Sequence, residues 1–378
     1  MLRRRSYLIL FFVRSLLGVL NLQGQEAFQQ YEKIVFGCYT ENEVEFQHFA
    51  QKAKELGATH ITVTAEDLPI AYHNLTPPGD PYPAWIITNP GLLHICPPAP
   101  LKPYIFRSYG EKVFDILEKR NAILEDLQMK AAFHTFEPQA LPDTVFYEHP
   151  SWRGPQVDNP LRSRKARFAP SMTNEDVLDL YNESIECLLQ RCPTLDILEM
   201  RTNDSGAGVE WSNALYAGPN GHASTKYLDM EDRISTFLNC LQDAAASAGG
   251  HLDVHLYNTK EDRLEIIASH LKEDIAVDNH EGPSGSTFKS SVGSLLNYRR
   301  PYAPVLGIPC PVSFLQELED ANEQAGARLF VYIGDRMNRN LYLHLYELFK
   351  KNPSGSLAAR MTLLHDLAVG EVGEDHAD

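Results

Sequence analysis

Short apolar runs alternate with longer stretches in which apolar residues recur three and four positions apart, along most of the 378 residues. Short runs of this kind favour β-strands, and the longer spacing is typical of amphipathic helices. The pattern predicts eight strands, over 33–39, 60–66, 130–137, 195–201, 251–258, 274–280, 303–310 and 328–335. It predicts helices over 41–58, 111–129, 173–192, 229–249, 261–271, 314–326 and 339–351.

The order of these elements predicts the fold class. Strands that alternate strictly with helices form a parallel sheet, so the chain belongs to the α/β class. Eight such units predict a (β/α)8 TIM barrel with enlarged βα loops. A doubly wound open sheet is the structural alternative, but no GxGxxG motif follows the first strand, which disfavours a dinucleotide-binding version. Gly57 and Gly249 are predicted helix ends, and Thr173 or Asn174 a helix start.

The two ends of the chain differ in composition from the rest. "MLRRRSYLILFFVRSLLGVLNLQGQ" has the basic start, apolar stretch and small polar region of a signal peptide, so residues 1–25 are predicted to be one. Arg14 interrupts the apolar stretch, and no stable membrane span is expected. We expect a secreted or periplasmic protein with a barrel over 30–352 and a C-terminal helix and acidic tail over 353–378.

Composition narrows the choice of partners. Hydrophobic residues make up 43% of the chain, enough for a large core, and the net charge of −16 argues against nucleic acid as the main partner. The six cysteines are scattered without a CxxC, which fits neither a disulfide scaffold nor a zinc ribbon. Cys38 and Cys310 are expected to be buried thiols, and one disulfide is possible in an exported protein.

Titratable residues gather just after the predicted strands. In a barrel these positions meet at one mouth, where charged groups must be paired, hydrated or used. The fourth strand is the richest, with "EMRTNDSGAG" over 199–208, and Glu199, Arg201 and Asn203 project to one side of an extended chain. An Arg between carboxylates would favour their ionised form.

This mouth has the residue types that a glycoside site needs. Cleavage of a glycosidic bond requires two carboxyl groups, one to protonate the leaving oxygen and one to attack or to activate water. Aromatic rings for stacking on sugars also occur in the βα segments. We predict the catalytic residues Glu199, Asp204 and Glu281. The predicted substrate-binding residues are Glu137, His134, Trp152, Arg201, Asn203, Trp211, His255, Tyr257, Asp278 and His280.

Two stretches carry a resemblance to a known group. "FHTFEPQALP" (133–142) and "EMRTNDSGAGVEWSNALYAGPNG" (199–221) resemble secreted bacterial proteins grouped with barrel glycoside hydrolases of the α-glucuronidase and β-hexosaminidase type. The resemblance implies a carbohydrate-active barrel acting on an oligo- or polysaccharide. The hexosaminidase pattern has an adjacent Asp-Glu pair after the fourth strand, where this chain has Glu199 and Asp204. Large retaining families have a Glu after the seventh strand, where "GIPCP" stands here.

Two other functions remain open. Metal-dependent amidohydrolase barrels place His after strands five and six and Asp after strand eight, and His255, His280 and Asp335 occupy those positions. That family's HxH motif is missing from the first strand, so no metal site and no cofactor is predicted. A barrel that binds glycan without cleaving it is the third possibility. No oligomeric state follows from the sequence.

Overall fold

The computed structural model describes most of the chain between residues 27 and 373. The described residues are 27–64, 90–158, 166–202, 206–209, 221–223, 225, 227–257, 264–277, 289–293, 311–323, 328–333, 338–353 and 355–373. The predicted signal peptide and the acidic end of the chain lie outside them.

Eight parallel strands form one curled sheet. Their order across the sheet is β8-β7-β6-β3-β2-β1-β10-β9. With β4 and β5 set aside, this is the chain order read backwards from β8 to β1, and β10 and β9 continue the sheet beyond β1. Consecutive neighbours of this kind define a sheet of the TIM-barrel type. The strands are β1 (Lys33–Cys38), β2 (His60–Thr62), β3 (Lys130–Phe136), β6 (Leu195–Arg201), β7 (Asp253–Tyr257), β8 (Ile275–Val277), β9 (Lys289–Gly293) and β10 (Arg328–Ile333).

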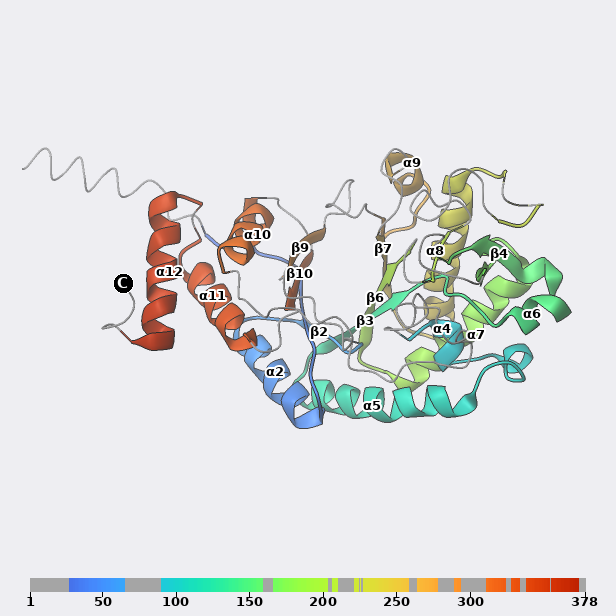
Figure 1. Cartoon of the computed structure of the whole chain (residues 1–378), viewed down its shortest axis with the longest axis horizontal. Coiled ribbons are helices and arrows are strands. Elements are labelled where there is room, and N and C mark those ends of the chain that lie inside the picture. Colours follow the sequence, from blue (N-terminus) through green and yellow to red (C-terminus); the bar gives the residue numbers. More distant parts are fainter. Residues whose placement is uncertain are drawn as a thin grey trace, which may run out of the picture.

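Helices cover the outer face of this sheet. Figure 1 shows α11, α2, α5, α7 and α8 arranged in an arc around the strands, with α12 outermost beside α11. The longer helices of the fold are α2 (Glu43–Glu55), α5 (Arg107–Asp126), α7 (Glu175–Arg191), α8 (Met230–Ser247), α10 (Pro311–Glu323), α11 (Arg339–Lys351) and α12 (Leu357–Val372). The shorter ones are α4 (Leu92–Ile95), η1 (Ala99–Leu101), α6 (Asp143–Glu148), η2 (Pro150–Trp152) and α9 (Leu264–Ala268).

Local signals account for the helix boundaries. The side chain of Asn174 accepts a hydrogen bond from the backbone N–H of Val177 and so caps α7, which settles the choice between Thr173 and Asn174. Gly57 and Gly249 follow α2 and α8 with φ angles of +95° and +76°. Glycine adopts this left-handed conformation without a steric penalty, so both helices end where the sequence predicted.

The two faces of the sheet bury different residues. Apolar side chains of the outer face, such as Phe36, Phe133 and Leu198, pack with the helices in the main core. The inner face carries a small separate cluster of Val35, Ala132, Ile197 and Phe330, here called the apolar layer. All four come from strands, as expected for the interior of a curled sheet whose side chains alternate between its faces.

Charged residues occupy the N-terminal end of the strands, near the apolar layer. Lys33 on β1 contacts Asp196 at 2.5 Å and Asp253 at 2.7 Å, and Arg328 on β10 contacts Asp253 at 2.8 Å. His60 on β2 completes the group with a 3.0 Å contact to Asp196. We call these five residues the ionic floor. It joins five strands of the sheet, which are far apart in the sequence.

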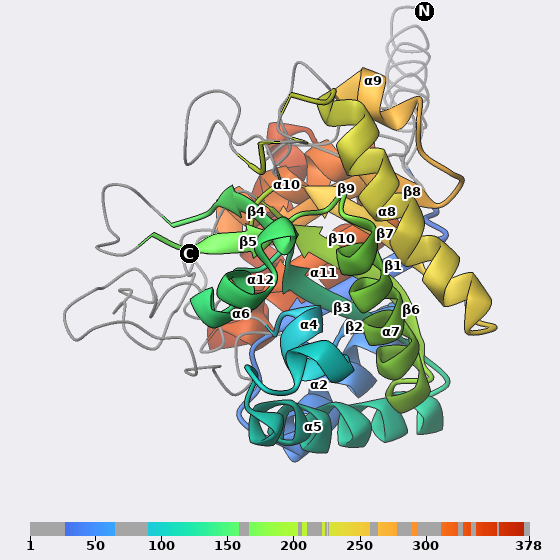
Figure 2. The same cartoon turned by 90° about the vertical axis from the view of Figure 1, so that its right-hand side faces the viewer.

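A smaller unit interrupts the barrel pattern between β3 and α7. The antiparallel strands β4 (Arg153–Gln156) and β5 (Phe168–Pro170) pair there, and they lie with α6 outside the main sheet (Figure 2). A disulfide joins Cys96, at the end of α4, to Cys187 on α7. The disulfide ties the segment between β2 and α5 to α7.

The seventh strand of the sheet is not where the sequence predicted it. The prediction placed it at 303–310, which lies outside the described residues, whereas β9 at Lys289–Gly293 pairs with β10 and fills this position. Its sequence, KSSVG, contains one large apolar residue, so apolar patterning could not detect it. The residues that follow it, "SLLNYRR", also lack Asp and Glu.

The prediction of a closed barrel goes beyond what the structure describes. The sheet curls through eight strands, but no pairing joins β8 to β9 within the residues described. The fold is therefore a curled parallel sheet of the TIM-barrel type. Among the described residues, no helix combines the length and apolar character that crossing a bilayer requires.

Candidate functional site

Three polar side chains lie level with one another on the inner face. In the register of the sheet, His134 on β3 is opposite Glu199 on β6, and Glu199 is opposite His255 on β7. We call these three the mouth row. The row lies two residues beyond Ala132 and Ile197 of the apolar layer, toward the carboxyl ends of the strands. Active sites of TIM-type barrels lie at that end.

Alternation along each strand turns the row inward. Leu198 and Met200, on both sides of Glu199, belong to the outer core. Val254 and Leu256 frame His255 in the same way, and the ring of His255 stacks against Phe330 of the apolar layer at 6.2 Å. Side chains of the row therefore point into the space that the sheet encloses.

The Glu199 side chain is largely buried, and a small part of it is exposed to solvent. It is 9% exposed, and its Oε2 lies 3.7 Å from Nδ1 of His134. His134 itself is partly exposed and makes an edge-to-face contact with the ring of Phe136 at 5.6 Å. A carboxyl group and an imidazole at this spacing form a pair that can donate or accept a proton at the mouth.

The backbone of His134 is held by a side chain. Strand β2 ends at Thr62, and beyond it the hydroxyl of Thr64 accepts a bond from the N–H of His134 at 2.6 Å and donates one to its carbonyl at 2.7 Å. These two hydrogen bonds take the place of the backbone pairing that a longer β2 would give to His134. This arrangement fixes His134 beside Glu199 without a longer β2.

Arg201 extends the site by one further step along β6. Its guanidinium lies 5.9 Å from the centre of the Phe136 ring. Beyond it, the loops after β3 and β6 remain joined, because Gln139 bridges Ala207 and the N–H of Glu137 bonds to the carbonyl of Arg201 at 2.9 Å. Residues from the two stretches that carry the resemblance therefore meet at one edge of the sheet.

Glu137 follows β3 but contacts protein groups. It is 1% exposed, and its carboxylate accepts bonds from the N–H of Leu92 at 2.6 Å, the hydroxyl of Tyr181 at 2.9 Å and the N–H of Gln139 at 3.0 Å. Burial raises the pKa of Glu137 to about 7, although these hydrogen bonds work in the opposite direction. Glu137 joins the end of β3 to α4 and α7.

Trp152 is also buried within the protein. Its ring stacks on His149 with centroids 3.8 Å apart, and its indole N–H donates to Asp176 on α7 at 3.2 Å. The Trp152 side chain is 6% exposed. Trp152 holds η2 against the start of α7.

The side chains of the remaining predicted residues are not placed by the structure. Tyr257 is described as part of β7, where its backbone is opposite Arg201. Six others lie outside the described residues, and their roles stay predictions: Asp204, Glu281, Asn203, Trp211, Asp278 and His280. His280 and Asp335 of the amidohydrolase alternative lie outside as well.

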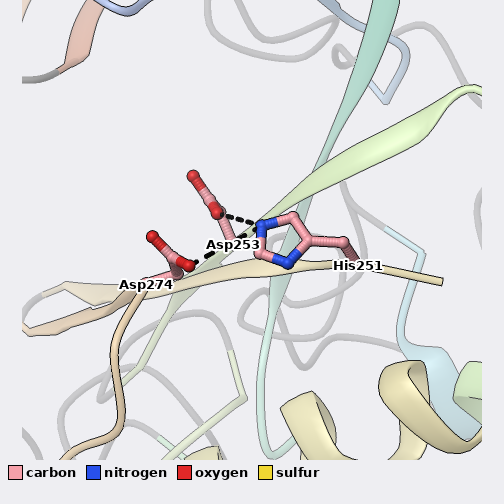
Figure 3. A group of neighbouring side chains, drawn as sticks. All are labelled: His251, Asp253 and Asp274. Carbon is pink, nitrogen blue, oxygen red and sulfur yellow. Dashed lines mark hydrogen bonds and ion pairs between the residues drawn. The ribbon is translucent and has the colours of Figure 1, made fainter.

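A group with the dimensions of a metal site occurs at the opposite end of the sheet. In the described part of the chain, His251, Asp253 and Asp274 are the residues whose ligand atoms cluster closely enough to hold an ion (Figure 3). Asp253, however, already contacts the cations Lys33 and Arg328. Two positive charges beside this carboxylate oppose the binding of a third, so the group extends the ionic floor.

Sequence reasoning missed several residues of the inner face. Thr64, Phe136 and Phe330 contact the mouth row, and none of them was singled out from the sequence. The alternation of β3 would have found Phe136, which is two residues after His134. The placement of Thr64 depends on where β2 ends, which no local pattern indicates.

Comparisons with known proteins give distant likenesses in structure alone. No family model and no curated protein matches the sequence. A GH138 enzyme targeting pectin rhamnogalacturonan II is similar with a TM-score of 0.49 at 9% identity, covering 91% of this chain and 51% of its own, so the chain spans about half its length. A GH20 module of the pneumococcal exo-β-D-N-acetylglucosaminidase StrH gives 0.46 at 13%, covering 92% and 93%.

Dispersin B gives a TM-score of 0.45 at 8% identity, covering 85% of this chain and 96% of its own. At these values the likeness concerns the general arrangement of strands and helices. The function of this chain has to follow from its own residues.

Proposed function

We propose that this protein is a glycoside hydrolase-like enzyme that cleaves a glycosidic bond in an oligo- or polysaccharide by carboxylate acid/base catalysis. The mouth row carries the proposal. Glu199 lies at the carboxyl end of a parallel sheet, inside its curl, with one imidazole opposite it on each neighbouring strand. This is where a barrel enzyme holds a group that transfers protons.

Each residue of the row has a proposed role. Glu199 is the catalytic acid, which protonates the leaving oxygen. His134 and His255 bind hydroxyl groups of the sugar and shape the charge around Glu199. Arg201, one step further out, is a further hydrogen-bond donor for the substrate.

The second carboxyl group comes from the segments after β6 or β8 in this proposal. Asp204 and Glu281 are the candidates, with Asp278, His280, Asn203, Trp211 and Tyr257 in binding roles. Glu137 and Trp152 are assigned positioning roles, since their polar atoms contact α4 and α7. The reaction needs two carboxyl groups at either of the separations known for inverting and retaining enzymes.

We also propose that the protein is exported from the cytoplasm. The basic and apolar start of the sequence and the Cys96–Cys187 disulfide support it, because disulfides persist mainly in oxidising compartments. A carbohydrate polymer outside the cell is a substrate that such a protein can reach.

A screen with aryl glycosides and uronic-acid-containing oligosaccharides, with and without a chelator, tests the proposal. We expect release of aryl alcohol or reducing sugar that a chelator does not reduce. Activity that requires a metal would favour the amidohydrolase alternative. Sugar binding without any turnover would favour a barrel that only binds glycan.

A further inference from the structure

Tyr332 lies on the inner face of β10, in the same layer as the mouth row. Val331 and Ile333, on both sides of it, belong to the outer core, so alternation along the strand turns Tyr332 inward. It comes two residues after Phe330 of the apolar layer, just as the mouth row comes two residues after other members of that layer. Phe330 is 6% exposed, whereas Tyr332 is partly exposed. The tyrosine therefore reaches solvent on the inner side of the sheet.

Strand β10 forms the side of the curl that faces β6 and β7 (Figure 1). In the order of the sheet, β6, β3, β2 and β1 separate β7 from β10, yet the ring centroids of His255 and Phe330 are 6.2 Å apart. Because the two strands are not neighbours, this contact crosses the space that the sheet encloses. Tyr332, one step beyond Phe330, therefore lies across this space from the strands that carry Glu199 and His255.

A glycine makes room for the tyrosine ring. Gly37 on β1 is opposite Tyr332 in the register of the sheet. A methyl group on Gly37 would lie 2.9 Å from Cδ2 of Tyr332 and 3.1 Å from Oγ1 of Thr62 on β2. The first separation is shorter than van der Waals contact allows, and Thr62 leaves the methyl group no room to turn away. The ring therefore packs directly on the backbone of β1, and a side chain at this position would displace it.

A ring held in this way can act as a platform for a sugar. One side of the Tyr332 ring rests on β1, so its exposed part is turned toward the enclosed space. The face of an aromatic ring carries partial negative charge, which attracts the C–H groups on one face of a pyranose. Stacking also removes apolar surface of both rings from water.

We propose that Tyr332 is a substrate-binding residue that stacks on the sugar ring cleaved beside Glu199, and that Gly37 is a positioning residue for it. The inference rests on the proposed function and deepens it. It places the sugar between an acid on one side of the mouth and an aromatic ring on the other.

Kinetics on the p-nitrophenyl pyranosides of glucose, galactose, N-acetylglucosamine and glucuronic acid test the ring. On the glycoside that wild type cleaves best, Tyr332→Ala should raise KM about tenfold, as expected for the loss of one stacked ring. The kcat value should fall less than about threefold, because stacking holds the substrate equally before and during the reaction. Tyr332→Phe keeps the ring and should keep KM within about threefold of wild type, since it loses at most one hydrogen bond.

A double-mutant cycle tests the glycine. Gly37→Ala should raise KM about as much as Tyr332→Ala does, because the added methyl group displaces the ring. Adding Gly37→Ala to Tyr332→Ala should raise KM no further, since the ring that the methyl group would meet is absent. If Gly37→Ala lowers the melting temperature and leaves KM unchanged, the positioning role is overturned.

Controls separate stacking from a purely structural role. Tyr147→Ala removes a tyrosine that is 79% exposed on α6, and its KM should equal that of wild type. Circular dichroism checks each fold, and Tyr332→Leu replaces Tyr332→Ala if the latter unfolds. An unchanged KM without the ring, or an equal loss in Tyr332→Phe, would overturn the stacking role and leave the proposed function standing.

Binding measurements distinguish this inference from the proposed function. Calorimetry with the same four glycosides in a Glu199→Gln background reports affinity without turnover. Weaker binding in Tyr332→Ala but not in Tyr332→Phe would support the stacking role even if wild type cleaved none of the four, a result that would count against the proposed function alone. Binding that does not depend on Tyr332, or no binding of any of the four glycosides by folded wild type, would overturn the inference.

Discussion

The residues on both sides of Glu199 already indicate which face of β6 its side chain lies on. Leu198 and Met200 are outer-core residues, so alternation alone turns Glu199 inward. His255 lies between the buried residues Val254 and Leu256. His134 lies between the buried residues Phe133 and Thr135. Sequence patterning could therefore predict each direction separately. The three residues are opposite one another because of the register in which the strands pair. The sequence of one strand does not determine this register.

Replacing His134 tests the role of the mouth row at the level of one residue. His134→Gln keeps a hydrogen-bonding side chain but removes the imidazole beside Glu199. We expect turnover of a cleavable glycoside to fall by about tenfold to a hundredfold, at the lower end of the usual contribution of acid/base groups. The measurement is kcat on the best substrate of the screen. An unchanged kcat would remove His134 from the site.

Glu137 predicts a pH dependence of stability. Because burial raises its pKa from 4.5 to about 7 in the folded protein, the folded state binds the proton more tightly than the unfolded state. The contribution of Glu137 to the free energy of unfolding should therefore be largest below about pH 4.5 and decline as the pH rises toward 7. Glu137→Gln should remove this decline.

Urea unfolding of both proteins at pH 5 and pH 8 measures the effect. Glu183→Gln is the matched control, because that carboxylate is exposed. An equal decline in wild-type protein and Glu137→Gln would show that another group is responsible.

At the scale of elements, the sequence predicted β6 and α11 with their full boundaries. Both have strong periodicity, and α11 has a wide apolar face. The seventh strand was missed because β9 is polar and short, and a sheet neighbour rather than its own residues makes it a strand. The pairing of β4 with β5 was missed for a similar reason.

The disulfide predicts how strongly α4 depends on its link to α7. Cys96 and Cys187 are 91 residues apart, so the bond restricts a long loop in the unfolded chain. Reduction should lower the free energy of unfolding by about 2–4 kcal/mol. Thermal unfolding with and without reductant checks this, and mass spectrometry identifies the bridged pair. A Cys96→Ser, Cys187→Ser double variant should be insensitive to the reductant, and a wild-type protein that is equally insensitive would contradict the link.

For the molecule as a whole, the ionic floor and the mouth row occupy opposite ends of the same enclosed space. The apolar layer lies between them, so the two polar groups are separated by packed side chains. The mouth row consists of residues that were predicted from the sequence, whereas the residues of the floor were not. Lys33, Asp196, Asp253 and Arg328 lie at strand starts, where charged residues are common and carry no local signal of pairing.

The floor predicts an acid sensitivity of the whole fold. Burial alone would raise the pKa of Asp196, but hydrogen bonds from His60 and Lys33 hold it well below its usual value of 3.8. The stability from this group is therefore present above pH 3.8 and is lost as the pH falls further. Asp196→Asn should cost about 1–2 kcal/mol at pH 7, since partial solvent contact screens the pairs, and much less at pH 3.

Urea unfolding at the two pH values checks the prediction, with Asp366→Asn on the exposed side of α12 as control. An equal cost of Asp196→Asn at pH 7 and pH 3 would show that its charge does not contribute. The pH range in which Asp196 affects stability lies below the range in which Glu137 does, so the two effects can be measured independently.

The most direct test of the account compares hydrolysis of one glycoside panel by three proteins: wild type, Glu199→Gln and Glu183→Gln. We predict that wild type and Glu183→Gln cleave the same glycoside, and that Glu199→Gln lowers the rate by about 10²- to 10⁴-fold while its circular dichroism spectrum is unchanged. Cleavage by Glu199→Gln at the wild-type rate would contradict the assignment of Glu199 as the catalytic acid.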